Sequence, residues 1–489
     1  MAEPYRKTKI IATVGPSVQH PRKILSLLKN GVNVFRLNFS HGDHAAHRRS
    51  VSIIRESSEK LGITVGILAD LQGPKIRTGN TYHDLPVKLK TGAHVILLSG
   101  TGTVSGYCTE SQITISYPTL AQEIRPRQII VINDGAILLE VTRIEQKKEK
   151  QKFGKIHCIV LSGGVYASKK GVNLPNVRLR IPSMTNKDLA DLKFILTLDI
   201  QYIALSFVRN ASDIIALRKL TKKKRPDIKL IAKIEKPEAA GAIDDILQAA
   251  DGIMAARGDL GVEAPPNEIP ILQKNIIRRA EVFRKPVIVA TQMLESMITN
   301  ALPTRAETTD VANAIFDGAD AVMLSGETAV GAHPEKAVKM MSEIAVSAER
   351  SIYIRNNLMR SRIGSTDIER EAVIAVCESA AWASAELSDI PICVFTLSGD
   401  TVIILSKMRT TAPIFAFSPD IRVVNLLSLA YNVRAFHIIF KQHIADLAEE
   451  AEKILIKNKY ISRGSRIILI FGTSPVRGAA NIMQIKKTR

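Results

Sequence analysis

The sequence predicts an α/β protein: a (β/α)8 TIM barrel with an inserted small β-barrel lid domain and a C-terminal α/β domain. Three observations carry this prediction. The chain has 489 residues, which at roughly 150 residues per domain suggests about three domains. Eight short β-branched apolar runs are each followed by a stretch with helical periodicity. About a hundred residues interrupt that series after its third unit and carry the period-two pattern of strands.

The first three strand–helix units precede the interruption. We expect strands at residues 9–14, 32–39 and 64–69, where apolar and β-branched side chains dominate. The stretch 21–29 is amphipathic and predicts the first helix, and Asp43 is placed to cap the second. These units therefore form the beginning of a barrel.

The interruption itself predicts a separate β domain. Apolar and polar side chains alternate at residues 87–98, 128–141 and 155–161, which is the pattern of half-buried strands. Glycine-rich turns separate these runs, among them Asn133-Asp134-Gly135.

The alternation of strands and helices resumes after the insert. Thr185 and Asp188 have the spacing of a capping box at the start of a helix. Five further strands are expected at residues 202–207, 229–234, 252–256, 286–290 and 321–324. Three units before the insert and five after it make the eight of a closed barrel over roughly 250 residues. A doubly wound open sheet is the alternative.

A polar connection at residues 356–369 leads to another series of strands and helices. Its strands are expected at residues 391–397, 413–417, 433–437 and 466–471, which make an α/β domain of ordinary size. The predicted division is a first barrel segment at 1–72, the lid at 73–172, a second barrel segment at 173–350 and the C-terminal domain at 351–489.

The charge balance is strongly positive. Lysine and arginine number 67 against 47 aspartate and glutamate, a net charge of +20, which attracts anions such as phosphorylated metabolites. Lysines cluster at residues 147–152 and 222–224, but only 5% of residues are aromatic, too few for a nucleic-acid stacking platform. We therefore expect no nucleic-acid partner.

No segment has the pattern of a signal peptide or a membrane span. The apolar stretch near the N-terminus is short, and residues 372–387 are interrupted by Glu378 and Glu386. We expect a cytoplasmic protein without a membrane partner. The four cysteines form no C-x-x-C pair, so we predict buried apolar side chains and no disulfide framework or zinc ribbon.

Charged side chains follow the predicted barrel strands, at the end where barrel enzymes carry out their chemistry. The basic ones are Arg36, Lys75, Arg77 and Lys233. Glu235 and Asp259 follow neighbouring strands and offer the hard oxygen ligands with which Mg²⁺ is held beside phosphate groups. Such a set neutralises a phosphoryl group in transfer, and the absence of G-x-x-x-x-G-K-[ST] excludes a P-loop.

Other interpretations of single residues stay open from the pattern alone. The carboxylates and lysines could form a structural ion-pair network, and Lys233 could be the Schiff-base lysine of an aldolase. His41, His44 and His47 recur at a spacing of three and could mimic a zinc site. Trp382, the single tryptophan, suits helix packing or a subunit contact better than a ligand platform.

Seven short motifs add a more specific signal. They are Thr8-Lys9-Ile10, Asn38-Phe39-Ser40-His41-Gly42, Gly73-Pro74-Lys75-Ile76-Arg77-Thr78-Gly79, Lys233-Ile234-Glu235, Ala256-Arg257-Gly258-Asp259-Leu260-Gly261, Ala290-Thr291-Gln292-Met293-Leu294 and Leu324-Ser325-Gly326-Glu327-Thr328. In this order and spacing they resemble the pyruvate kinase family, over essentially the whole chain and less closely after residue 350. The resemblance implies transfer of the phosphoryl group of phosphoenolpyruvate to ADP, giving pyruvate and ATP in the last step of glycolysis.

The resemblance also implies roles for individual residues. The catalytic set would be Lys233, Arg36, Thr291 and Ser325, with Thr291 and Ser325 on the side where the enolate is protonated. The substrate contacts would be Arg36, Lys233, Gly258, Asp259 and Thr291. The nucleotide contacts would be Asn38, His41, Arg77 and, on the lid, Lys170. Glu235 and Asp259 would hold Mg²⁺ or Mn²⁺.

One position departs from the commoner pattern of the family. Many members have glutamate where this chain has Lys75, and they bind K⁺ through residues that match Asn38, Ser40, Asp70 and Leu71. The ammonium of Lys75 can take the electrostatic place of that ion, as in the potassium-independent branch that this segment resembles. We therefore expect activity without added K⁺.

The C-terminal domain offers a second anion site. Thr396, Ser398, Gly399 and Thr401 lie between a strand and a helix, where the family binds phosphorylated effectors. Asp400 opposes an anion there and the loop at 472–477 is short, so an ordinary helix cap is the alternative. The resemblance further suggests a homotetramer. A metal-dependent lyase barrel and a basic RNA-binding or scaffolding protein are the competing functions.

Overall fold

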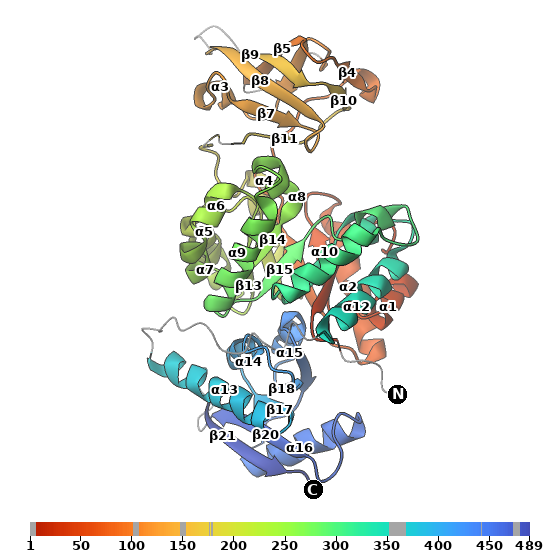
Figure 1. Ribbon diagram of the computed structural model, residues 1–489, viewed down its shortest axis with the longest axis vertical. Coiled ribbons are helices and arrows are strands. Elements are labelled where there is room, and N and C mark those ends of the chain that lie inside the picture. Colours follow the sequence, from red (N-terminus) through yellow and green to blue (C-terminus); the bar gives the residue numbers. More distant parts are fainter. Residues whose placement is uncertain are drawn as a thin grey trace.

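The computed structural model describes residues 6–100, 107–146, 153–175, 177, 179–351, 368–441, 443–472 and 480–489. The lysine cluster at 147–152, nearly all of the expected connection at 356–369 and the loop at 473–477 lie outside these residues. Figure 1 shows three domains stacked along the long axis, with the lid at the top, the barrel in the middle and the C-terminal domain at the bottom.

Eight parallel strands close into a barrel. They are β1 (Lys9–Thr13), β2 (Val34–Asn38), β3 (Gly66–Asp70), β12 (Tyr202–Leu205), β13 (Lys229–Ile234), β14 (Gly252–Ala256), β15 (Val287–Ala290) and β16 (Ala321–Leu324). Their order around the barrel is β1-β16-β15-β14-β13-β12-β3-β2. The predicted (β/α)8 barrel is thus confirmed, and the alternative of an open sheet is wrong.

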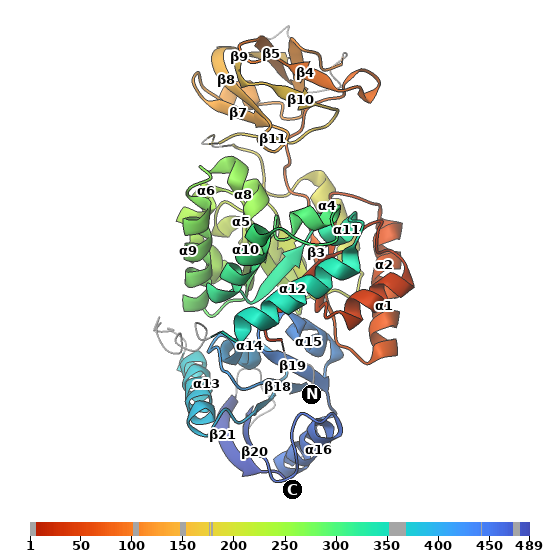
Figure 2. The same cartoon turned by 45° about the vertical axis from the view of Figure 1, so that its right-hand side comes forward.

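Helices surround this barrel (Figure 2). They are α1 (Pro21–Lys29), α2 (His44–Leu61), α4 (Asn186–Ile195), α5 (Ala211–Lys222), α6 (Pro237–Gly241), α7 (Ile243–Ala249), α8 (Arg257–Glu263), α9 (Ile269–Val282), α10 (Arg305–Phe316), α11 (Gly326–Ala329) and α12 (Pro334–Glu349). Two predicted caps are confirmed. Asp43 accepts a hydrogen bond from the Ala46 N–H at 2.7 Å, and Thr185 and Asp188 form the capping box of α4.

Strand alternation decides what lies inside the barrel. Every second side chain of a strand points inward, and Ile11, Leu68, Ile231 and Met254 fill the interior with apolar packing. Lys233 is two residues beyond Ile231 on β13, so it points inward one layer closer to the carboxyl ends of the strands. The same alternation places Arg36, two residues after Val34, and Asp70, two residues after Leu68, on the inner side of the barrel.

The lid is built of strands between β3 and α4. They are β4 (Val87–Leu89), β5 (His94–Gly100), β6 (Gln112–Ile115), β7 (Ile129–Ile132), β8 (Ile137–Glu145), β9 (Phe153–Ser162), β10 (Gly164–Tyr166) and β11 (Val172–Asn173), with helix α3 (Leu120–Glu123). Six of them form one sheet in the order β11-β7-β8-β9-β5-β6, curled into a half-barrel. The run expected at 87–98 is two strands, because Gly92 turns the chain with φ +82°.

The C-terminal domain is a five-stranded sheet. Its strands are β17 (Ile392–Phe395), β18 (Ile414–Ser418), β19 (Val433–His437), β20 (Arg466–Gly472) and β21 (Ala480–Lys487), and its helices are α13 (Ile368–Glu386), α14 (Asp400–Ser406), α15 (Ile421–Leu426) and α16 (Ile444–Lys457). The order is β19-β18-β17-β20-β21, and β21 pairs antiparallel with β20. Sequence analysis did not predict β21.

This domain closes the bottom of the barrel. Leu426 and Leu429 pack among the interior side chains of the barrel, and the Tyr202 hydroxyl donates to the Leu426 carbonyl. Lys407 and Asp320 form a buried ion pair between the two domains at 2.6 Å. The opposite end, where the strands finish, faces the lid (Figures 1 and 2).

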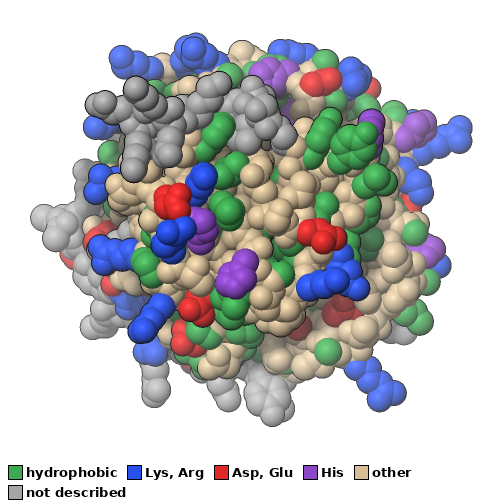
Figure 3. Space-filling model, turned by 90° about the horizontal axis from the view of Figure 1, so that it is seen from above, with side chains coloured by type: hydrophobic (Ala, Val, Ile, Leu, Met, Phe, Trp, Pro, Cys, Tyr) green, Lys and Arg blue, Asp and Glu red, His purple; other side chains and the backbone are tan. Residues whose placement is uncertain are grey.

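Other sequence predictions concern the surface. All four cysteines are buried and free, as expected. Among the described residues, no helix is long and apolar enough to cross a membrane. Trp382 on α13 is 56% exposed. Figure 3 looks onto the outer face of the lid, where Lys and Arg side chains are scattered both within the face and around its margin.

Candidate active site

Lys233 is the centre of a buried polar cluster at the mouth of the barrel. Its ammonium lies 2.8 Å from Glu235 Oε1 and 3.2 Å from Asp70 Oδ1, and it donates to Ser206 Oγ at 2.7 Å. Burial alone would lower the pKa of Lys233, but Asp70 and Glu235 outweigh it and raise the pKa above its ordinary value. A neutral amine, which a Schiff-base lysine needs, is therefore disfavoured here.

Arg36 extends the cluster across β2 and β3. Its guanidinium binds Asp70 Oδ2 at 2.7 Å and donates to Thr13 Oγ1 at 3.1 Å. Burial raises the pKa of Asp70, but Lys233 and Arg36 together bring it below its ordinary value. Asp70 thus stays ionised between two cations and fixes both of them at the mouth.

Glu235 and Asp259 offer carboxylate oxygens to a metal ion. Glu235 Oε2 accepts the Phe207 N–H at 2.8 Å, while Oε1 is buried and has only the ion pair with Lys233, with no aligned hydrogen-bond donor. Burial raises the pKa of Glu235, Lys233 opposes that rise and the charge of Asp259 adds to it, and the net pKa is about 6. An incompletely satisfied carboxylate beside a second, partly exposed one fits Mg²⁺, which takes one or two carboxylates with water and substrate.

Thr291 and Gly258 are in direct contact. Thr291 Oγ1 accepts the Gly258 N–H at 2.7 Å and donates to the Ala290 carbonyl at 2.5 Å. Ser325 Oγ is buried and has no hydrogen-bond partner among the described residues, and its N–H donates to Glu327 Oε2 at 2.7 Å. The hydrogen-bonding capacity of the Ser325 hydroxyl is thus unused among the described residues.

The predicted nucleotide residues lie on the lid side of the mouth. Arg77 and Gly171 form a bridge between two segments at the base of the lid, and the Arg77 guanidinium donates to the Lys169 carbonyl at 3.0 Å. The Lys170 N–H donates to Thr78 Oγ1 at 3.0 Å, which fixes the backbone beneath its side chain. Arg77 and Lys170 therefore belong to one ribbon above the barrel.

The loop after β2 carries Asn38, Ser40 and His41. Asn38 Oδ1 accepts the Ser40 N–H at 3.1 Å. Burial lowers the pKa of His41, and the charges of Arg77, Lys75 and Arg36 lower it further. The imidazole is therefore neutral in a positive surrounding, which suits a site for anionic phosphates.

Lys75 pairs with Asp259 at 3.7 Å. The carboxylate of Asp70 is occupied by Arg36 and Lys233, and the Leu71 carbonyl accepts Ser206 Oγ at 2.7 Å. Lys75 is thus brought to the site from the lid side, next to a carboxylate of the expected metal site.

Two of the three histidines of the suspected zinc pattern, His44 and His47, have separate partners. His44 binds Asp191 at 2.7 Å and stacks on Phe194, while His47 binds the His41 carbonyl and stacks on Phe39. Among the described residues, no group of three metal-ligating His, Cys, Asp or Glu side chains occurs.

Side chains of the predicted effector loop bond to other groups of the loop and to one lysine of the barrel. The Gly399 N–H donates to Thr396 Oγ1 at 2.9 Å, Ser398 Oγ donates to Asp400 Oδ2 at 2.8 Å, and Asp400 pairs with Lys229 of the barrel at 2.9 Å. Thr401 is buried. Gly399 is the N-cap residue of α14, and among the described residues no side chain caps this helix.

Sequence analysis missed several residues of the site. Ser206 follows β12, the strand whose end was not considered, and the strand-end rule applied there would have found it. Thr13 at the end of β1 could have been found in the same way. Arg257 belongs to one of the motifs quoted above, but no role was predicted for it, because that role appears only in its contacts with the turn after β15.

Fold and site together define a class of protein: a barrel enzyme of phosphoryl transfer, with a lid over a mouth that combines a pair of carboxylates with fixed cations. The chain belongs to the pyruvate kinase family. The family model of the pyruvate kinase barrel domain matches residues 5–338, and that of the pyruvate kinase alpha/beta domain matches residues 374–486.

Full-length comparisons agree. A pyruvate kinase of Geobacillus stearothermophilus is 41% identical over 487 residues, which cover 98% of this chain and 80% of that protein. A pyruvate kinase of Corynebacterium efficiens is 38% identical over 481 residues, with coverage of 98% and 97%. The crystal structure of a pyruvate kinase from Cryptosporidium parvum matches with a TM-score of 0.89 at 34% identity, over 99% of this chain and 96% of that one.

The activity is accordingly that of a pyruvate kinase (EC 2.7.1.40), a glycolytic enzyme that transfers a phosphoryl group from phosphoenolpyruvate to ADP. The family depends in general on a divalent metal. The competing lyase and RNA-binding functions are therefore set aside.

Proposed function

We propose that this pyruvate kinase requires Mg²⁺, needs no K⁺, and uses Lys233 to neutralise the phosphoryl group in transfer. The observation that carries the proposal is the ammonium of Lys233, held by Ser206, Asp70 and Glu235 at the barrel mouth. A cation fixed in advance stabilises developing charge without reorganising during the reaction.

Arg36 binds the phosphate of phosphoenolpyruvate from the other side of Asp70. The two cations lie on opposite oxygens of that carboxylate, so a phosphoryl group above it meets both. Gly258, Asp259 and Thr291 contact the rest of the substrate. Thr291 and Ser325 lie on the side where the C3 carbon of the enolate takes a proton and becomes the methyl group of pyruvate.

Glu235 and Asp259 would hold Mg²⁺, or Mn²⁺ in its place. When bound, the ion neutralises phosphoryl oxygens and polarises the phosphorus–oxygen bonds. Asn38, His41, Arg77 and Lys170 would bind the phosphates of ADP. The lid carries Lys170 over the mouth and would exclude water, which protects the phosphoryl group from hydrolysis.

Lys75 would replace K⁺ in this enzyme. Its ion pair with Asp259 supports a tethered positive charge at the mouth of the barrel. The positions that match the potassium ligands of other members, Asn38, Ser40, Asp70 and Leu71, would then bind no K⁺. We further propose a cytoplasmic homotetramer with domain boundaries at 72/73, 172/173 and 350/351.

A phosphorylated effector at Thr396, Ser398, Gly399 and Thr401 completes the proposal. Asp400 would have to tolerate the anion or turn fully toward Lys229, with which it already pairs.

One assay tests these points together. Turnover of phosphoenolpyruvate and ADP is coupled to lactate dehydrogenase, with Mg²⁺ titrated in buffers of tetramethylammonium or potassium salts. We expect Mg²⁺-dependent turnover in both buffers. Turnover without a divalent metal would contradict the role of Glu235 and Asp259. Sugar phosphates and AMP added to the same assay test the effector site.

A further inference from the structure

The turn after β15 is held in an unusual conformation. Thr291 has φ +70° and Gln292 has φ +54°, so two consecutive residues other than glycine occupy the left-handed region. This conformation is unfavourable for residues other than glycine, and it persists only when neighbouring groups determine it. Contacts from the surrounding structure must therefore stabilise this turn.

Arg257 provides these contacts. Its Nη2 donates to the Thr291 carbonyl at 2.9 Å and to the Gln292 carbonyl at 3.1 Å, and its Nε donates to the Thr291 carbonyl at 3.3 Å. Nη1 pairs with Asp310 of α10 at 2.6 Å, and the side chain is only 9% exposed. The guanidinium thus joins both left-handed carbonyls to a carboxylate on another helix.

The next residue, Gly258, adds a further hydrogen bond to the turn. Gly258, next to Arg257 in the chain, donates its N–H to Thr291 Oγ1 at 2.7 Å. A Cβ at position 258 would lie 3.3 Å from that oxygen, so the glycine allows this close approach. The Arg257–Gly258 pair therefore fixes Thr291 at its carbonyl and at its hydroxyl.

We propose that Arg257 is a positioning residue that places the Thr291 hydroxyl for proton transfer at C3 of the enolate. The inference rests on the proposed role of Thr291. Arg257 does not touch substrate; it acts through the turn. Lysine keeps the charge but not the planar fork that reaches two carbonyls and a carboxylate, so Arg257→Lys should release the turn. A displacement of about 1 Å at a reacting group lowers the rate by about 10²-fold.

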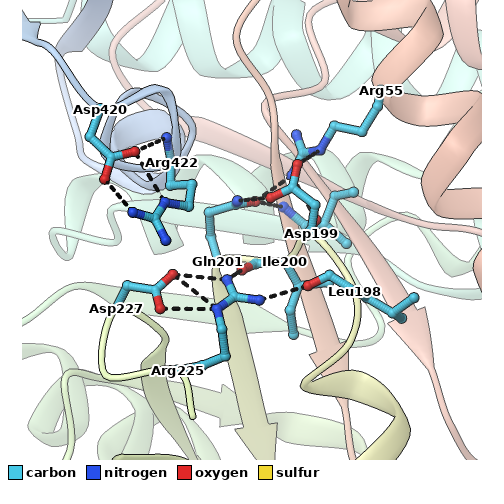
Figure 4. A network of polar contacts seen from close by, with 10 residues as sticks. Arg55, Leu198, Asp199, Ile200, Gln201, Arg225, Asp227, Asp420 and Arg422 are labelled. Carbon is cyan, nitrogen blue, oxygen red and sulfur yellow. Dashed lines mark hydrogen bonds and ion pairs between the residues drawn. The ribbon is translucent and has the colours of Figure 1, made fainter.

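Arg225 offers a matched control at the other end of the barrel. It donates to the carbonyls of Leu198 and Ile200 at 2.8 and 3.1 Å and pairs with Asp227 at 2.8 Å (Figure 4). Its contacts are of the same kind, two carbonyls and one aspartate, in segments that precede β12 and β13. Arg225→Lys therefore removes a similar structural clamp without touching the site.

The test is the exchange of pyruvate methyl hydrogens with solvent in D₂O, followed by NMR with the Mg²⁺-loaded enzyme and ATP. In this exchange a C–H bond of the methyl group breaks, the proton leaves to the enzyme, and a deuteron from solvent returns to the same carbon. We expect Arg257→Lys to slow exchange by about 10²-fold, with KM for phosphoenolpyruvate and ADP changed by less than about threefold. Millimolar guanidinium should partly restore exchange in Arg257→Ala.

A second variant separates this inference from the role of Thr291. We expect Thr291→Val to slow exchange, and Arg257→Lys added to Thr291→Val to slow it no further, because both act on one hydroxyl. Three results would each overturn the inference and leave the role of Thr291 intact. They are slowing by Thr291→Val but not by Arg257→Lys, equal slowing by Arg225→Lys, and additive losses in the double variant. Unchanged exchange in Thr291→Val would overturn the role of Thr291 in the proposed function, and the inference with it.

Discussion

The ammonium of Lys233 lies 2.8 Å from Oε1 of Glu235, which comes two residues later, directly after β13. Alternation along the strand directs both side chains toward the barrel axis. The pair therefore joins the cation proposed to neutralise the phosphoryl group to a carboxylate of the proposed metal site. A change in either residue should disturb charge neutralisation more than binding.

Lys233→Met should lower kcat by about 10³-fold and leave KM for phosphoenolpyruvate nearly unchanged, because the cation acts chiefly on charge that develops in the transition state. Lys407→Met is the matched control. Lys407 is also a buried lysine paired with an aspartate, but at the bottom of the barrel. Both variants should lose thermal stability, and only Lys233→Met should lose kcat per folded molecule. Ordinary turnover in folded Lys233→Met would contradict the assignment.

Lys75→Glu should make the enzyme dependent on K⁺. In the wild type the ammonium of Lys75 lies 3.7 Å from Asp259 and supplies a positive charge at the mouth. The variant replaces it by a negative charge, so we expect a loss of about tenfold or more in tetramethylammonium salts, restored by potassium at equal ionic strength. Many-fold stimulation of the wild type by potassium would refute the premise.

Asn173→Ala should weaken the use of ADP. Asn173 in β11 of the lid donates to Glu263 Oε1 of α8 at 3.0 Å, and Glu263 also pairs with Lys236 at 3.1 Å. A buried hydrogen bond to a charged group contributes about 1.5–3 kcal/mol, so its loss should raise KM for ADP by about tenfold by freeing the lid beside Lys170.

Steady-state kinetics of Asn173→Ala should show an unchanged KM for phosphoenolpyruvate. Thr142→Ala is the control, because Thr142 also lies in the lid and bonds only the His157 carbonyl at 3.0 Å on an exposed surface. A rise in both Michaelis constants, or an equal effect of Thr142→Ala, would show that Asn173 does not act through the lid.

The barrel and the central residues of the site could be predicted because the sequence repeats the strand pattern eight times and the ends of the eight strands meet in a closed barrel. Arg36, Lys233 and Glu235 follow or end apolar strands, and a closed barrel brings such ends together. The partner of Lys75 could not be predicted, since a long flexible side chain selects among several carboxylates only in three dimensions.

Two other features could not be predicted from the sequence, for different physical reasons. The strand β21 has polar and charged side chains at an edge of its sheet, so its apolar alternation is weak. The clamp by Arg257 depends on backbone angles of the turn it holds, and no residue type in Thr291-Gln292 announces them. Contacts that depend on a tertiary conformation leave no periodic signal in sequence.

Lys9 at the start of β1 should give the stability of the protein a distinct pH dependence. It is buried where the barrel meets the C-terminal domain and donates to the Val433 carbonyl at 2.7 Å. Burial, together with the charges of Arg6 and Arg434 and against the opposing charge of Glu349, lowers its pKa to about 7. In the unfolded chain the pKa is about 10.4.

Between about pH 7 and pH 10 the folded protein therefore binds fewer protons at Lys9 than the unfolded chain does, so this group makes the free energy of unfolding rise with pH. The slope is at most about 1.4 kcal/mol per pH unit. Lys9→Met removes the titration, so its Tm relative to wild type should fall as pH rises from about 7 to about 9.5. Lys23→Met, which removes an exposed lysine, should keep a constant difference. A constant difference for Lys9→Met as well would mean that Lys9 keeps its proton in the folded protein throughout this range, with Glu349 and the Val433 carbonyl compensating its burial.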